Sequence, residues 1–106
     1  LAGHLDAKSA ADTLFIFDEP TTGLHLDDIS RLIECFRKLI EKGNSVVIIE
    51  HNIHVIASAD HIIDLGPEAG EKGGEIIAEG TPEEIVNAEK SYTGKALRKF
   101  LSKGNR

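Results

Sequence analysis

The sequence predicts an α/β fold with a mainly parallel sheet, flanking helices, and a C-terminal β-hairpin followed by further helices. Two apolar runs, 14–17 and 46–49, each end in ionisable residues, and such short runs are typical of strands buried in parallel sheets. An amphipathic helical pattern lies between them, which gives a strand–helix–strand unit with a right-handed crossover. Apolar runs at 61–65 and 75–79 flank a glycine-rich stretch, 70–74, and predict the hairpin.

Composition limits the size and class of the protein. The 106 residues suffice for at most one domain of ordinary size, and the 41% hydrophobic and 28% charged content is typical of a globular chain. A formal net charge of −6 argues against a self-contained nucleic-acid module. The single cysteine, Cys35, excludes an intrachain disulfide and is expected to be a semi-buried structural thiol. Because the chain starts at Leu1 without a methionine, we expect it to belong to a longer protein.

The first strand is expected over Leu14–Asp18, buried on both faces and preceded by a helix-compatible segment, 1–11. Asp18 and Glu19 then lie at the carboxyl end of the strand, where open α/β sheets bind their ligands. Pro20 ends the strand because it has no N–H to donate. Two adjacent carboxylates favour a site for a metal ion and a water over a helix cap.

The central helix is expected to be capped at its start by Asp27 and Asp28 and at its end by Gly43–Asn44. Its apolar residues recur at steps of three and four and form one stripe: Ile29, Leu32, Ile33, Phe36, Leu39 and Ile40. The next strand runs into Glu50 and His51. Parallel strands end on the same edge of a sheet, so the sequence predicts that Asp18, Glu19, Glu50 and His51 meet there.

The last part of the chain is expected to be mainly helical. Asn52 should cap a short helix that extends to Ala59. Thr81–Glu84 has the pattern of a capping box with proline at the first helical position, and the helix it begins should extend to about Ala88. A final helix after Ser91 should bury one face: Ala96, Leu97, Phe100 and Leu101. Its basic residues form a tail whose contact with DNA is left open.

The residues at the shared strand edge suit phosphoryl transfer. Asp18 could hold Mg²⁺ directly or through water, since hard oxygen ligands suit that ion. Glu19 could polarise a water, and His51 could hydrogen-bond a terminal phosphate. The sequence contains no G-x-x-x-x-G-K-[ST] loop, so the part that cradles the phosphates is missing.

These motifs resemble those of the ABC-type ATPases. Leu14–Leu24 resembles the Walker B and D-loop segment, and Glu50–His51 resembles the strand end that carries the switch histidine. Glu79–Glu84 is similar to the usual end of the ATPase core. The resemblance implies a partial P-loop (ABC-type) core, with 1–106 forming the C-terminal part of one nucleotide-binding domain without its Walker A and signature motifs. In that fold a Walker A strand would separate 46–50 from 62–65.

Three segments narrow the resemblance to one family. Thr21–His25, Asp64–Gly70 and Ser91–Lys95 resemble the C-terminal part of the UvrA family of bacterial excinuclease proteins. His25 discriminates, because transport ATPases usually carry aspartate at that position. By resemblance, Glu19 is the catalytic carboxylate and His51 the γ-phosphate sensor. Asp18 assists Mg²⁺ through water, and the D-loop residues Gly23, Leu24 and His25 communicate between paired nucleotide sites.

The same resemblance implies a function for the whole protein. It would be a homodimeric, cytoplasmic bacterial ATPase that uses ATP and Mg²⁺, recognises damaged DNA in nucleotide excision repair, and loads the excinuclease B subunit. Zinc is expected only in parts of the protein outside this chain, and the isolated chain is expected to be inactive. Two alternatives stay open: the ATPase subunit of an ABC transporter, and a non-catalytic α/β interaction domain in which the acids are caps.

Overall fold

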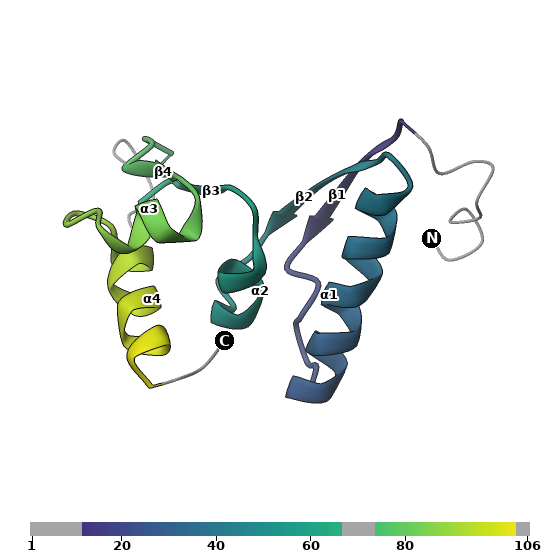
Figure 1. The fold of residues 1–106 in the computed structure, drawn as a ribbon, viewed down its shortest axis with the longest axis horizontal. Helices are drawn as coiled ribbons and strands as arrows, with labels where there is room; N and C mark the ends of the chain where they lie inside the picture. Colours follow the sequence, from purple (N-terminus) through teal and green to yellow (C-terminus); the bar gives the residue numbers. More distant parts are fainter. Residues whose placement is uncertain (1–11, 67–73, 104–106) are drawn as a thin grey trace. The chain divides into compact units, whose positions relative to one another are not determined.

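The computed structural model describes residues 12–66 and 74–103 (Figure 1). The chain divides into two compact units, one that ends at His51 and one that begins at Asn52. The expected N-terminal helix over 1–11 and most of the glycine-rich turn lie outside the described residues. Within the described ranges, no helix is both long enough and apolar enough to cross a membrane.

The first unit is the predicted strand–helix–strand motif. It consists of β1 (Leu14–Asp18), α1 (Leu26–Glu41) and β2 (Ser45–Ile49). The two strands pair in parallel, with Leu14 opposite Ser45 and Asp18 opposite Ile49. Figure 1 shows α1 running alongside both strands. The parallel pairing confirms the sequence prediction and brings the carboxyl ends of β1 and β2 to one edge.

Only one face of this small sheet is covered by described residues. On that face the rings of Phe17 and Phe36 lie 4.9 Å apart, and Phe36 is buried with the other core residues of α1, Ile29 and Leu39. On the opposite face Leu14 and Ile16 are 58% and 64% exposed. The expectation that β1 is buried on both faces is therefore wrong for this chain, because one helix can cover only one side of a two-stranded sheet.

The ends of α1 differ in detail from the prediction. His25, rather than an aspartate, is the N-cap, so Asp27 and Asp28 lie in the first turn and favour the helix through its dipole. Cys35 is exposed rather than semi-buried, because it lies beside the apolar stripe. At the other end, Asn44 is buried: its side-chain amide donates to the Leu39 carbonyl at 2.9 Å.

The second unit contains α2 (Ile53–Ser58), β3 (Ile62–Asp64), β4 (Ala78–Gly80), α3 (Pro82–Val86) and α4 (Tyr92–Ser102). The predicted caps are confirmed, since Asn52 accepts hydrogen bonds at the start of α2 and Thr81–Glu84 forms a capping box at α3. The predicted hairpin is also confirmed: β3 and β4 pair antiparallel, with Ile62 opposite Gly80. However, β4 begins at Ala78 rather than Glu75: Ala78–Gly80 pairs with the three residues of β3, and the Ile77 N–H before it donates to the Asp64 carbonyl at 2.7 Å.

The described strands form two separate two-stranded sheets, one parallel and one antiparallel. The fold is therefore mixed α/β, but the single, mainly parallel sheet of a partial P-loop core is not observed. β3 pairs only with β4 among the described strands.

The core of the second unit is built around Ile62, Ile85 and Leu97. Leu97 is fully buried, and Phe100 is partly buried with its ring edge-on to His54 at 5.1 Å. The other two residues of the predicted apolar face of α4, Ala96 and Leu101, are exposed. The buried face of α4 is thus narrower than the sequence pattern indicates.

A partly buried chain of hydrogen bonds joins the end of β3, at Asp64 and Gly66, to the segment Ser91–Lys95. The Ser91 hydroxyl donates to Asp64 Oδ2 at 2.5 Å and accepts the N–H of Gly94 at 2.8 Å. The second oxygen of Asp64 accepts the N–H of Gly66 at 3.0 Å. Ser91 therefore acts as the N-cap of α4 and also fastens that helix to the end of β3.

The capping box of α3 should make this helix sensitive to acid. Thr81 N donates to Glu84 Oε1 at 2.9 Å, and hydrogen bonds from the Thr81 backbone and then its hydroxyl hold the pKa of Glu84 below its ordinary 4.5, with a smaller contribution from His61. The folded state thus favours the ionised form, and this contribution to stability is complete above about pH 4.5 and is lost as pH falls through the lowered pKa. An NMR titration of the Glu84 carboxyl carbon should show a midpoint below 4.5. A midpoint at or above that value would contradict the assignment, and Glu84→Gln should remove the transition.

Candidate active site

The carboxyl ends of β1 and β2 form the site. The Glu19 N–H donates to the Ile49 carbonyl at 2.7 Å, which extends the strand ladder by one residue beyond Asp18. Glu19 is thereby held beside the residue that follows β2, Glu50. The prediction that these strand ends meet at one edge is confirmed.

Glu19 adopts an unusual backbone conformation. Its φ is 46°, in the left-handed region that residues with a side chain seldom occupy. Its carbonyl accepts two hydrogen bonds from Thr22, from the N–H at 3.3 Å and the hydroxyl at 3.0 Å, which stabilise the turn. Such conformations cost roughly 1–3 kcal/mol and cluster at functional sites. Strain at this position supports a functional role for the Glu19 carboxylate.

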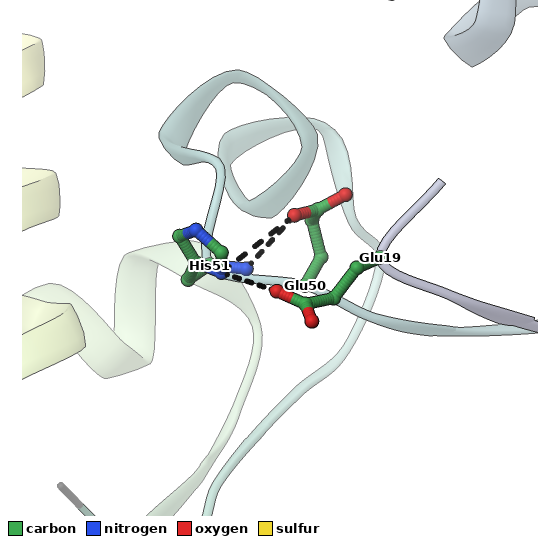
Figure 2. Close-up of side chains that lie close together, drawn as sticks. All are labelled: Glu19, Glu50 and His51. Carbon is green, nitrogen blue, oxygen red and sulfur yellow. Dashed lines mark hydrogen bonds and ion pairs between the residues drawn. The ribbon is translucent and has the colours of Figure 1, made fainter. Parts of the chain in front are cut away.

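Glu19 and His51 are brought together from the two strand ends. His51 Nδ1 lies 3.0 Å from Glu19 Oε1, and the dashed line in Figure 2 joins the two side chains. The side chains of His51 and Glu19 are 85% and 49% exposed. Exposed ion pairs contribute little to stability, so this pair does not hold the fold together. Its exposure leaves both groups accessible to a ligand.

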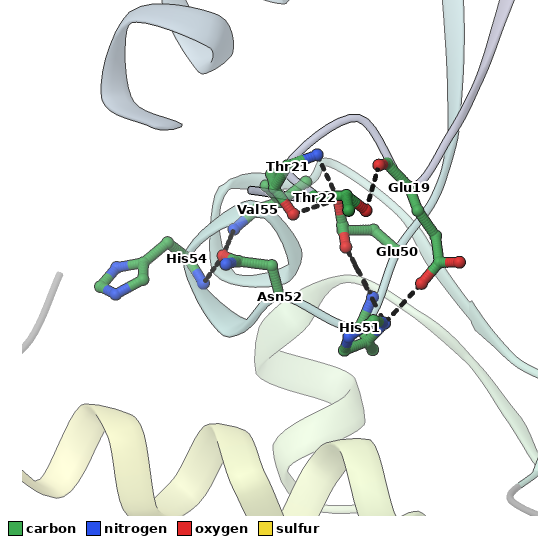
Figure 3. A network of polar contacts seen from close by, with 8 residues as sticks. All are labelled: Glu19, Thr21, Thr22, Glu50, His51, Asn52, His54 and Val55. Atoms are coloured by element: carbon green, nitrogen blue, oxygen red, sulfur yellow. Dashed lines mark hydrogen bonds and ion pairs between the residues drawn. The ribbon is translucent and has the colours of Figure 1, made fainter. Parts of the chain in front are cut away.

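Glu50 has the opposite character, since its side chain is only 3% exposed. Its Oε2 accepts hydrogen bonds from the Thr21 N–H at 3.2 Å and the Thr21 hydroxyl at 2.7 Å (Figure 3). Its Oε1 accepts the N–H of His51 at 3.1 Å. Sequence reasoning placed Glu50 at the edge but gave it no role, and its position directly before His51 was the only available signal.

Three potential metal ligands lie close together at this edge. Glu19, Glu50 and His51 each offer one atom within 4.8 Å of the others. Both oxygens of Glu50 already accept hydrogen bonds, so a cation bound there would compete with the Thr21 and His51 donors. Asp18, the predicted Mg²⁺ residue, is exposed at the last position of β1 and is not part of this cluster.

The predicted D-loop residues lie on the exposed turn between β1 and α1, outside the cluster. Gly23 has a φ of 78°, which favours glycine. The Leu24 N–H donates to the Thr21 carbonyl at 3.0 Å, and the His25 carbonyl accepts the N–H of Ile29 at 3.0 Å. The turn therefore connects the Thr21 anchor directly to the first turn of α1.

No family model matches the chain, but individual known proteins do. It is 57% identical over 103 residues to UvrABC system protein A of Aquifex aeolicus (strain VF5) and 55% identical to that of Halalkalibacterium halodurans, and each alignment covers 97% of this chain but 11% of the relative. A crystal structure of UvrA2 from Deinococcus radiodurans matches with a TM-score of 0.78 and 42% identity, covering 85% of this chain and 11% of that one.

Sequence and structure comparisons agree on one family, and they confirm the resemblance that the motifs indicated. The high identity extends over almost the whole chain, so it does not depend on the shared ATPase motifs alone. The chain spans 11% of the length of these relatives. It therefore belongs to the UvrA family, as a segment of a UvrA protein.

Proposed function

We propose that the chain is the C-terminal part of a UvrA nucleotide-binding domain and supplies the catalytic half of its ATP-hydrolysing site. The observation that carries this proposal is the exposed Glu19–His51 pair, held at 3.0 Å where two parallel strands end. The relatives are named as parts of the UvrABC system, which supports a role in recognising damaged DNA during bacterial nucleotide excision repair.

The pair suits phosphoryl transfer, in which catalysis consists mainly of positioning and charge stabilisation. The Glu19 carboxylate orients and polarises the attacking water. His51 contacts Glu19 through Nδ1, so in the imidazolium form, in which both ring nitrogens are donors, its Nε2–H can donate to a phosphate oxygen. One exposed ring can in this way connect the catalytic carboxylate with the terminal phosphate.

The chain supplies only part of the proposed site. The exposed carboxylate of Asp18 suits Mg²⁺, held through water, because that ion prefers oxygen ligands and retains several waters. The sequence has no phosphate-cradling loop, so the isolated chain should not hydrolyse ATP. Gly23, Leu24 and His25 would communicate with the second nucleotide site of a homodimer. Two further parts of this proposal are a cytoplasmic location and a partnership with the excinuclease B subunit.

His51→Ala in the full-length protein tests the catalytic assignment. Loss of one hydrogen bond to a charged phosphate should lower ATP turnover by about 10–100-fold, because such a bond is worth roughly 1.5–3 kcal/mol. His61→Ala is the matched control, since His61 pairs with Glu79 in the second unit at 3.3 Å. Unchanged turnover in His51→Ala would contradict the assignment.

Binding to damaged and undamaged DNA duplexes, measured with the same full-length protein, tests the repair assignment. A damage-recognition protein should bind the damaged duplex more tightly at equal salt. Equal binding together with normal ATP turnover would favour the transporter-type alternative. Equal binding without turnover would favour a non-catalytic interaction domain.

A further inference from the structure

We infer that Glu50 is a positioning residue that fastens the turn after β1 to the end of β2 and so holds Glu19 and His51 in one geometry. The effect expected on ATP turnover rests on the function proposed above. The structural part of the inference rests only on the hydrogen bonds and burial of Glu50.

The contacts of Glu50 are those of a buried anchor. A carboxylate is costly to bury unless it is hydrogen-bonded, and Glu50, at 3% exposed, accepts the three bonds described above. All three donors approach a carboxylate, which makes the bonds stronger than those between neutral groups. Two come from Thr21 and one from His51, so a single side chain bridges both strand ends (Figure 3).

The hydrogen bonds of Glu50 fix the backbone next to the proposed catalytic pair. Glu19 is fixed on one side by its N–H bond to Ile49 and on the other by the turn that Thr21 anchors. Its left-handed backbone is strained, so a turn released at Thr21 can relax to a commoner conformation and move the carboxylate away from His51. A displacement of about 1 Å can lower a catalytic rate by about 10²-fold, which makes such an anchor consequential.

The chemistry of the contacts explains why a carboxylate is required. Glutamine has the same shape, but only one of its two terminal atoms accepts hydrogen bonds. N–H donors face both oxygens of Glu50. In Glu50→Gln the NH₂ group is itself a donor, so it must point either at the donors of Thr21 or at the N–H of His51, and that hydrogen bond is lost. The conservative replacement should therefore release one of the two strand ends.

The first test uses Thr21 in the full-length protein. Thr21→Val removes the hydroxyl donor with little change in shape and should lower kcat for ATP about tenfold, with KM changed less than about twofold. Thr21→Ser keeps the hydroxyl and should restore kcat to within about twofold of the parent. Glu50→Gln should lower kcat by about 10–100-fold. If Thr21→Val and Thr21→Ser give equal kcat values, the inference is overturned.

A second readout does not depend on turnover. Hydrogen–deuterium exchange of peptides that cover 19–24 should accelerate at least about tenfold in Thr21→Val and Glu50→Gln, and not in Thr21→Ser. Peptides from α1 should keep their parent rates, which shows that the variants are folded. Unchanged exchange over 19–24 in both variants would overturn the inference even if activity falls.

The two readouts separate this inference from the proposed function. If exchange accelerates in Thr21→Val and Glu50→Gln, and not in Thr21→Ser, while the unmodified protein has no ATPase activity, the anchor stands and the catalytic proposal fails. If Glu19→Gln abolishes turnover but Thr21→Val and Glu50→Gln keep the parent kcat, the catalytic proposal stands and the positioning role fails.

Discussion

ATP turnover by the full-length protein should fall about 10²–10⁴-fold when Glu19 is replaced by Gln, the range typical of losing a general base. Glutamine has the size of glutamate and retains an oxygen for the contact with His51, which lies 3.0 Å from the carboxylate in the structure. It has no negative charge to polarise a water. Steady-state release of inorganic phosphate at saturating ATP and Mg²⁺ measures the effect.

Glu34→Gln is a suitable control for that measurement, because it makes the same chemical change at an exposed position of α1. It should leave turnover within about twofold of the parent, as is usual for surface substitutions. Glu19→Gln should also bind nucleotide about as tightly as the parent, since the carboxylate acts on the water. Parent-like turnover in Glu19→Gln would refute the catalytic role.

Gly94→Ala should destabilise the second unit by about 3 kcal/mol or more, at the upper end of overpacking effects. A methyl group at Gly94 would lie 2.2 Å from the Ile85 carbonyl oxygen, and backbone cannot move aside as a flexible side chain can. The Gly94 N–H donates to the hydroxyl of the N-cap residue Ser91 at 2.8 Å. A shift of Gly94 away from Ile85 would also break this capping hydrogen bond. The gain in helix propensity from alanine, about 1 kcal/mol, is too small to compensate.

Urea unfolding followed by tyrosine fluorescence measures this effect specifically. The 106-residue chain is used for this measurement, since within it Tyr92 is the only tyrosine and there is no tryptophan, and Tyr92 begins α4. The midpoint should shift strongly downward in Gly94→Ala. Lys95→Ala, at the next and exposed position, provides the control, and its midpoint should stay at or slightly above that of the parent. Equal midpoints for the two variants would show that the close approach of α4 to Ile85 is not needed.

Local patterns predicted much of the fold. Steps of three and four defined α1, and the apolar runs on either side of it defined a parallel pair whose register brings Asp18 opposite Ile49. The Thr81–Glu84 capping box formed as expected because its contacts lie within one helical turn. The helix and the capping box depend on residues close in sequence, and the parallel pairing follows from the strand–helix–strand order, so the sequence contains nearly all the information about them.

The burial of side chains was predicted less well, because it depends on which other parts of a protein cover them. Leu14 and Ile16 look like core residues from composition, yet they are exposed in this chain. The same holds for Ala96 and Leu101 on α4. A chain that spans 11% of its relatives' length cannot itself supply every surface against which its apolar residues pack.

The sequence by itself determined the family, the strand–helix–strand motif and the edge at which Glu19 and His51 would meet, since topology alone brings the ends of parallel strands together. Only the tertiary structure decided how that edge is fastened. The hydrogen bonds that Thr21 donates to Glu50 cross 29 positions of the chain, and the left-handed Glu19 lies directly before the turn that they anchor. Contacts between distant residues depend on three-dimensional packing, and for that reason no local pattern revealed the anchor.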